Sequence, residues 1–422
     1  MRKLPAYTVY LVITGVFSVL FTMMAFISAL YRVQTAGLNP LQLVLLGTAL
    51  ELSVFFFEIP TGLVADLYSR RLSVIVGYAV IGAGFMLEGA FTFFSTIALA
   101  QIVWGAGYTF ISGAQDAWLA DEIGEAQLAQ AYLRASQVGR GGALAGILIS
   151  MGLGSLYLGL PIFLAGVLLV GLALFLVLFM PETGFAPTPR PERTTWQKMV
   201  DTFGDGLQLA RDRPTLILIL AITFILGLSS EGLDRLWEAH MLANFAFPAA
   251  GSLEPVFWFG AMSVTTLLLG IAVTEVVRRR LAVESIEVTL WVQFAINLIT
   301  IAGIVVLGLA ARFGAAVIAI IAVQVSRSAY EPLYRAWINK EMESRVRATV
   351  LSMNGQLNAV GQIAGGPLIG VVATSLSLRA AMVGVALLWS PVLLLYALAL
   401  QRHRLVTRSF LAHQDDVGGR VG

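Results

Sequence analysis

The sequence contains no cysteine and only three histidines among its 422 residues. The absence of cysteine excludes disulfide bonds, thiolate catalysis and cysteine-ligated metals, and three histidines leave little room for a metal centre. Charged residues are also scarce, at 12% of the chain against about 25% in soluble proteins. Because so few charges cannot cover a water-facing surface of this size, a soluble enzyme is excluded.

Hydrophobic residues are abundant instead, at 58% of the chain with a mean hydropathy of +0.83. They gather in apolar stretches near the length of about 20 residues that a helix needs to cross a bilayer. Twelve such stretches are predicted, at residues 6–30, 41–65, 72–94, 96–119, 132–155, 157–180, 214–238, 254–277, 286–309, 313–337, 348–374 and 379–401. The sequence therefore predicts an all-α integral membrane protein with 12 transmembrane helices in a lipid bilayer.

A polar stretch separates the sixth span from the seventh. It begins with the proline-rich run PETGFAPTPRPE and continues with apolar residues at helical spacing, Trp196, Met199, Phe203 and Leu207. This spacing predicts an amphipathic helix on the membrane surface. We therefore predict four regions: an N-terminal half (1–180), a cytoplasmic linker (181–213), a C-terminal half (214–401) and a cytoplasmic tail (402–422).

The positions of Lys and Arg predict the orientation. With the N-terminus inside, all but five of the 27 Lys and Arg residues lie in cytoplasmic loops, in the tails or in the adjoining turns. The five exceptions are Arg32, Arg235, Arg312 and Arg379 outside and Arg327 within a span. Because basic residues concentrate on the cytoplasmic side of membrane proteins, both termini are predicted to be cytoplasmic, in the cell membrane.

The two halves of the sequence repeat each other weakly. The segment DLYSRRLSV from Asp66 matches EVVRRRLAV from Glu275, and Pro5 matches Pro214 at the same offset. Further matches follow in the same order at a slightly larger offset, between Trp118 and Trp337, Glu122 and Glu341, Gln137 and Gln356, Gly142 and Gly361, and Gly146 and Gly365. Duplicated six-helix halves are typical of secondary transporters, with the substrate site near mid-membrane.

The loop between spans two and three has the sequence GLVADLYSRR. It resembles the signature of the major facilitator superfamily, Gly-x-x-x-Asp-x-x-Gly-Arg-Lys/Arg, through Gly62, Asp66, Arg70 and Arg71, with Ser69 in place of the second glycine. The resemblance implies the fold of that superfamily, two six-helix halves, and secondary active transport by alternating access rather than catalysis.

Two further segments, FEIPTG and PET after span six, resemble drug:proton antiporter members of the superfamily. Two positions depart from those members. Gln101 stands where their span four has arginine, and the segment QVGRGGALAG of span five lacks their proline.

The resemblance also implies a gating motif at the cytoplasmic rim. Asp66 would accept hydrogen bonds from the N-terminus of the eleventh span, where the helix dipole favours an anion. Gly62 would allow close helix approach, while Arg70 and Arg71 would pair with the acids at the end of span four, Asp121 and Glu122. These contacts would latch the outward-facing state; the alternative is that both arginines only set the membrane orientation.

Charged residues within the spans are costly in a bilayer and are therefore often functional. The candidates for proton coupling or substrate binding are Glu51, Glu231, Arg327 and Glu331. Arg327 and Glu331 are four residues apart on one helix face, so they are predicted to pair. For each candidate the alternative is a structural role in helix packing.

Other charges in or near the spans point more to structure than to function. Glu88 falls toward the outer leaflet of a peripheral span, which favours a packing role. Asp234, Arg235 and Glu238 lie near the outer mouth of span seven, where we expect a solvated rim.

Aromatic residues are predicted to line the transport cavity: Trp104, Tyr108, Tyr330 and Tyr334. Such a cavity suits an amphipathic or lipophilic substrate, which gains from ring contacts and from burial. Aromatic stripes also occur in ordinary helix packing, and that alternative stays open.

Three classes of function were weighed. The leading one is proton-coupled efflux of amphipathic small molecules, of the multidrug-resistance antiporter type. The alternative is an importer, symporter or uniporter, of a polar and possibly anionic nutrient or metabolite. A membrane enzyme or receptor is disfavoured because no nucleophile–base set, metal cluster or phosphate loop is present. We expect a small-molecule substrate, protons as the coupling ion, no cofactor, no nucleic-acid partner and a monomer.

The gating motif yields a first prediction. Asp66→Asn should abolish or cripple transport while expression and membrane insertion stay normal, because a neutral amide loses the attraction to the helix dipole and to arginine. Glu275→Gln, at the matching position of the second half, serves as the control and should show a milder loss. Near-normal flux in Asp66→Asn would contradict the latch.

Overall fold

The computed structural model describes residues 3–186, 204, 213–248, 254–280, 285–341 and 344–418. Within these ranges the chain is helical and contains no strand. The helices are α1 (Ala6–Leu30), η1 (Tyr31–Thr35), α2 (Pro40–Leu67), α3 (Arg70–Ala90), α4 (Phe94–Ile111), α5 (Ala114–Ile123), α6 (Glu125–Gly154), α7 (Gly159–Phe179), α9 (Pro214–Asn244), α10 (Glu254–Arg280), α11 (Ile286–Leu309), α12 (Phe313–Glu341), α13 (Ser344–Ser375), α14 (Leu378–Trp389) and α15 (Pro391–Gly418). The predicted all-α class is confirmed.

Eleven helical segments of the described chain are long and apolar enough to cross a membrane. They correspond to eleven of the predicted spans. The fifth predicted span corresponds to α6, which carries the charged residues Glu125, Arg134 and Arg140 between its start and its middle. The amphipathic helix predicted around Trp196 and Phe203 lies outside the described residues.

Two predicted spans are interrupted helices. The fourth span divides into α4 and α5 at Gly113, whose φ of 73° lies in the left-handed region that glycine adopts without steric cost. The twelfth span, predicted as one helix over 379–401, divides into α14 and α15 at Ser390. Pro391 explains this second break, because proline has no backbone N–H to continue the helical bonding. Helix α15 then continues to Gly418, through most of the region predicted as a tail.

The chain packs into two compact units. Unit 1 consists of Met1–Lys198, Asp234–Val264 and Gly366–Leu378, and unit 2 consists of Met199–Leu233, Thr265–Gly365 and Arg379–Gly422. Compact units group residues by packing, whereas the predicted halves group them by sequence repeat. The sequence boundaries at residues 180 and 214 therefore stay a prediction.

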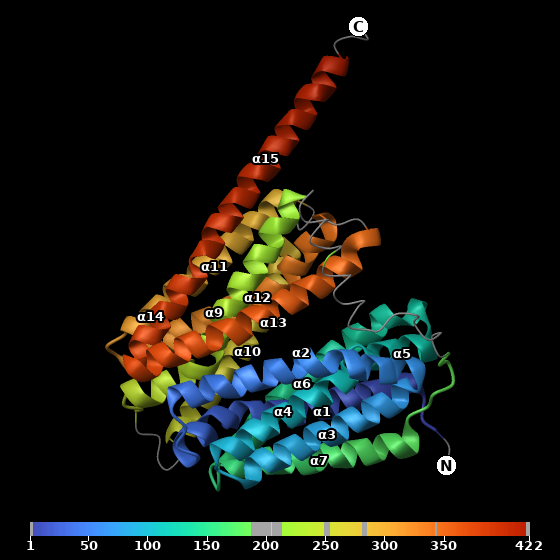
Figure 1. The fold of residues 1–422 in the computed structure, drawn as a ribbon, viewed down its shortest axis with the longest axis vertical. Coiled ribbons are helices and arrows are strands. Elements are labelled where there is room, and N and C mark those ends of the chain that lie inside the picture. Colours follow the sequence, from blue (N-terminus) through green and yellow to red (C-terminus); the bar gives the residue numbers. More distant parts are fainter. Residues whose placement is uncertain are drawn as a thin grey trace. The chain divides into compact units, whose positions relative to one another are not determined.

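Helices of unit 1 pack in close pairs, α1 with α6, α3 with α7, and α4 with both α2 and α3 (Figure 1). Glycines allow the closest approach. A Cβ atom built on Gly166 of α7 would lie 2.5 Å from the backbone oxygen of Gly82 on α3, and one built on Gly82 would lie 2.7 Å from that of Gly166. Small residues at helix contacts are the usual means of close packing in membranes, where dispersion replaces the hydrophobic effect.

Unit 2 is held together partly by buried polar side chains. Helix α11 packs against α12 and α15. The indole Nε1 of Trp389 donates to Asn297 Oδ1 at 2.9 Å, and Gln293 Nε2 donates to the Tyr330 carbonyl oxygen at 3.0 Å. These bonds satisfy polar groups that would be costly if left unpaired away from water. The bond from Gln293 also fixes the α12 backbone at Tyr330.

The glycine contact between α3 and α7 predicts the effect of one methyl group. Gly166→Ala should destabilise the protein by roughly 1–3 kcal/mol, because backbone atoms rather than flexible side chains must move. Gly171→Ala on the same helix is the matched control, since a Cβ atom there meets no described atom within 4 Å. Thermal denaturation of the purified protein in detergent should show a lower melting temperature for Gly166→Ala only. Equal melting temperatures for the two variants would exclude this contact as a constraint.

Candidate functional site

The predicted gating motif spans the end of α2 and the start of α3. Asp66 is exposed in the last turn of α2. A Cβ atom built on Gly62 would meet no described atom within 4 Å, so the close helix approach expected there is not seen in this part of the chain. Ser69, which replaces the glycine of the signature, caps α3 by accepting a bond from the Leu72 N–H at 2.9 Å. This position thus acts as a helix cap, which glycine does less well.

The two arginines of the motif bind different groups. Arg70 forms a salt bridge with Asp121 of α5, and its Nη1 also donates to the Ala117 carbonyl oxygen at 2.8 Å. Arg71 Nη2 donates to the carbonyl oxygen of Val177, near the end of α7, at 2.6 Å. The arginines therefore connect α3 to α5 and to α7.

The segment that follows α7 closes the same cluster. Glu182 accepts bonds from the Ser69 hydroxyl at 2.7 Å and from the Arg71 backbone N–H at 2.9 Å, at the N-terminus of α3. On the other side, Glu122 accepts from the Thr183 hydroxyl and from the Gly184 N–H, each at 2.8 Å. The PETG sequence thus ties the start of α3 to the end of α5 within unit 1.

Unit 2 contains a cavity of about 380 Å³, which we call the aromatic–amide cavity. It is lined from α9, α12 and α13 by Thr223, Leu226, Tyr330, Glu331, Tyr334, Arg335, Ile338, Leu351, Asn354, Gly355 and Asn358. The rings of Tyr330 and Tyr334 stack with centroids 5.2 Å apart and planes 22° apart. The Tyr334 hydroxyl lies 2.6 Å from Thr223 Oγ1 and donates to Asn354 Oδ1 at 3.2 Å. The cavity therefore joins flat apolar rings to hydrogen-bonding groups.

The charged residues near this cavity pair along the helix. Glu331 Oε1 lies 2.6 Å from Arg335 Nε, and the two side chains are 58% and 71% exposed. Glu331 is thus salt-bridged to Arg335, four residues after it in the sequence, whereas Arg327 lies four residues before it. Arg327 was predicted to pair with Glu331; its guanidinium lies 5.8 Å from the centre of the Trp389 ring, a cation–π distance.

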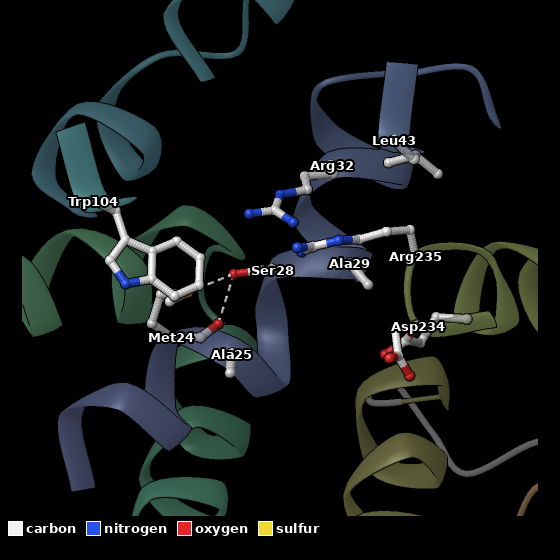
Figure 2. Close-up of a pocket in the computed structure, with 10 residues that line it drawn as sticks. Met24, Ala25, Ser28, Ala29, Arg32, Leu43, Trp104, Asp234 and Arg235 are labelled. Atoms are coloured by element: carbon white, nitrogen blue, oxygen red, sulfur yellow. Dashed lines mark hydrogen bonds between the residues drawn. The ribbon is translucent and has the colours of Figure 1, made fainter. Parts of the chain in front are cut away.

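Unit 1 contains a smaller pocket of about 100 Å³, shown in Figure 2, which we call the two-arginine pocket. It is lined by Met24, Ala25, Ser28, Ala29, Arg32, Leu43, Trp104, Asp234, Arg235 and Glu238. In Figure 2 the guanidinium groups of Arg32 and Arg235 extend toward each other from different helices. Both are predicted from the sequence to lie on the outer side, in a loop or at a solvated rim; the structure places them together in one pocket with Trp104.

A buried network holds Arg32 in place. Arg32 Nε and Nη2 each lie 2.8 Å from Glu88 Oε1, and Gln101 Nε2 donates to Glu88 Oε2 at 2.7 Å. All three residues are buried, with exposures of 5%, 1% and 0% for Arg32, Glu88 and Gln101. Arg32 belongs to the π-helical turn η1, an arrangement found frequently at functional sites. Glu88 thus joins helices of unit 1, and it also holds a cation beside a pocket.

The remaining candidates are placed separately. Glu231 of α9 is buried at 2% exposure and Glu51 of α2 is partly exposed; each interacts with neighbouring groups. Trp104 packs against Phe21 and Phe85, at ring distances of 5.9 and 5.6 Å. Tyr108 is 45% exposed. Within the described ranges, no group of three His, Asp or Glu side chains is placed to hold a metal ion.

Sequence reasoning missed several residues of these sites. Thr223 and Asn354 lie on different helices from Tyr334, and Arg32 is 56 residues from Glu88. One signal was available: a Glu within a span implies a basic partner, and Arg32 and Arg235 are two of the four arginines predicted on the outer side.

The comparisons with known proteins agree with this architecture. The sequence matches the Major Facilitator Superfamily over residues 10–366, and the chain belongs to that family. It is therefore a multi-pass membrane protein and a secondary transporter. An uncharacterized MFS-type transporter of Bacillus subtilis (strain 168), YxaM, is 23% identical over 363 residues, covering 85% of this chain and 87% of that protein.

Solved transporter structures share the fold. The nucleoside transporter NupG superposes with a TM-score of 0.72 at 14% identity, covering 94% of this chain and 99% of that chain. A bacterial homologue of the human lysosomal transporter Spinster, in an inward-facing and unoccupied conformation, gives 0.70 at 15% identity, covering 94% and 98%. The human organic anion transporter MFSD10 gives 0.62 at 15% identity, covering 93% and 99%.

The buried network around Glu88 yields a prediction about stability. Arg32→Ala should destabilise the protein by roughly 3–5 kcal/mol, because it leaves the buried carboxylate without its cation. The double variant Arg32→Ala with Glu88→Ala should recover much of the lost stability, because no buried charge is left unpaired. Melting temperatures and yields of the purified proteins measure both effects.

The matched control is Arg335→Ala, which removes an exposed pair of the same chemistry and should cost only about 0–1 kcal/mol. If the single and double variants at Arg32 and Glu88 melt at the same temperature, the pair does not stabilise unit 1.

Proposed function

We propose that this transporter exports amphipathic, ring-bearing small molecules from the cell in exchange for protons. It would act as a monomer in the cell membrane with both termini in the cytoplasm, as the distribution of Lys and Arg favours. The observation that supports this substrate class is the aromatic–amide cavity, where the Tyr330 and Tyr334 rings stack beside polar side chains. A planar ring can pack against Tyr330 and gain both burial and ring contact.

The amides of the cavity favour a substrate with hydrogen-bond acceptors. Asn354 Oδ1 accepts from the hydroxyls of Thr223 and Tyr334, and Asn358 Oδ1 accepts from Gln362 Nε2 at 2.6 Å. With their oxygens engaged, both side chains have their Nδ2 groups left to donate. Asn354 and Asn358 are four residues apart on α13, so the two donors lie on one helix face. A substrate with a carbonyl or hydroxyl oxygen beside a ring could bind both the amide donors and the tyrosine ring of the cavity.

A second candidate is import of a polar anion, and the two-arginine pocket favours it. Arg32 and Arg235 present two guanidinium groups to one small volume (Figure 2). Planar guanidinium groups bind carboxylates and phosphates well. Transporters of nucleosides and of organic anions share this fold, so the architecture accommodates either class.

Direction of transport separates the two candidates. Expression in a host sensitive to many compounds should raise its tolerance to dyes or antibiotics if the protein exports amphipathic molecules. An importer of anions should leave tolerance unchanged and increase uptake of radiolabelled carboxylates or phosphate esters into intact cells. Unchanged tolerance across a broad panel would overturn the export proposal.

The aromatic–amide cavity predicts the effect of removing one ring. Tyr330→Ala should weaken the apparent affinity for an exported dye by roughly 2- to 10-fold, the factor that corresponds to losing a ring contact of about 0.5–1.5 kcal/mol. Tyr330→Phe is the matched control, because it keeps the ring and loses only the hydroxyl that contacts Tyr396. Dye efflux from everted vesicles measures both. Equal affinities for the Ala variant and the wild type would exclude Tyr330 from the substrate site.

A further inference from the structure

The charges gathered at the two-arginine pocket do not cancel. Two cations, Arg32 and Arg235, face three carboxyl groups: Asp234 and Glu238 on the same pocket wall, and Glu88 behind Arg32. The other walls of the pocket contribute no charge, since α2 presents Leu43 and α4 presents Trp104. If all three acids were ionised, the cluster would have a net charge of −1. A net charge in or near the hydrocarbon region is costly unless it is paired or neutralised.

Two of the three acids have hydrogen-bond partners or access to solvent. Glu88 accepts two contacts from Arg32 on one oxygen and a hydrogen bond from Gln101 on the other. Asp234 is exposed and interacts with neighbouring groups. Glu88 is therefore stabilised by its partners, and Asp234 keeps access to solvent.

Glu238 differs from both. Its Oε2 atom is buried, and within the described part of the chain it has no hydrogen-bond partner. A buried carboxylate oxygen without a hydrogen-bond donor loses its hydration, and no hydrogen bond within the protein compensates for that free-energy cost. The neighbouring His240 makes no hydrogen bond to this Oε2; its ring packs on Phe245, and its Nδ1 lies 3.2 Å from Asn244 Nδ2. The atom that lacks a partner thus belongs to the same cluster that has one negative charge in excess.

We infer that Glu238 is a proton-binding carboxylate of the two-arginine pocket, and that it is the group through which the proposed transport is coupled to protons. The coupling role of Glu238 rests on the proposed function, whereas proton binding by Glu238 rests on the pocket alone. Binding forms an O–H bond at a carboxyl oxygen of Glu238 with a proton from water, which removes the excess charge. Release returns the proton to water and leaves a carboxylate that Arg32 and Arg235 stabilise.

Glu331 is less suited to this role, because it is exposed and salt-bridged to Arg335. Glu238 faces two cations within one pocket, so a shift of either guanidinium changes how strongly it holds its proton. Arg32 lies on a π-helical turn, and Arg235 lies three residues before Glu238 on α9. Proton binding at Glu238 is thereby linked to whatever binds the arginines.

Infrared difference spectroscopy of the purified protein tests the proton directly and needs no transported substrate. When the pH is raised from acidic to alkaline, the wild type should lose the C=O stretching band of a protonated carboxyl group in an apolar setting. Glu238→Gln should lack that band, and Glu238→Asp should keep it at a shifted position. Glu287→Gln, which removes an acid from an exposed pair with Arg404, is the matched control and should leave the band unchanged. A band that persists in a folded Glu238→Gln protein would overturn the proton site.

Transport assays test the coupling separately. With a compound from the tolerance panel, Glu238→Gln in proteoliposomes should keep downhill exchange and lose accumulation driven by a pH gradient. Preserved pH-driven accumulation in this variant would overturn the coupling role, whatever the infrared result. If the wild type transports no compound while the band still depends on Glu238, the proposed function fails and the proton site stands.

Discussion

Each charge that this chain places inside the membrane has to be matched there, and that requirement shapes the structure. With 12% charged residues and 58% hydrophobic ones, the helices can span the bilayer, but every buried ionic group needs a partner. The Arg32–Glu88–Gln101 network is the clearest case, because all of its members are buried and Glu88 is bonded at both oxygens. It fixes α1 to α3 and α4 and holds a cation at the edge of a pocket.

The same requirement explains why polar clusters sit where they do. At the gating motif, Arg70, Glu122 and Glu182 bind helix ends and backbone groups that would otherwise be unpaired. In unit 2, hydroxyl and amide groups satisfy one another around Tyr334. Among the acidic side chains of the described residues, Glu238 differs, since its Oε2 is buried without a hydrogen-bond partner. A buried carboxyl oxygen without a hydrogen-bond partner calls for an explanation, and proton binding supplies one.

The sequence predicted the elements well because a membrane span is a local property. An apolar run of about 20 residues is visible in any window of that size, so eleven of the twelve predicted spans reappear among the long apolar helices. The break before Pro391 was missed because the apolar run continues across it. The stack of Tyr330 on Tyr334 was accessible too, since residues four apart share a helix face.

The candidate sites were less predictable because their partners are far apart in the sequence. Arg32 follows the first apolar run and was therefore assigned to an outer loop, yet it continues the helix as a π turn and binds Glu88, 56 residues later. Glu182 bonds to Ser69 across 113 residues. No periodicity within one helix contains such information, and only the packing of helices brings these residues together.

Proton-coupled transport is tested most directly by measuring whether protons move when a transported compound moves. Purified protein would be reconstituted into liposomes that contain a pH-sensitive dye, with equal pH on both sides and a gradient of a compound selected by the tolerance panel. If export is coupled to protons, the compound moving down its gradient drives protons in the opposite direction, so the internal pH changes relative to that of protein-free liposomes. Movement of the compound with no change in internal pH would contradict proton-coupled transport.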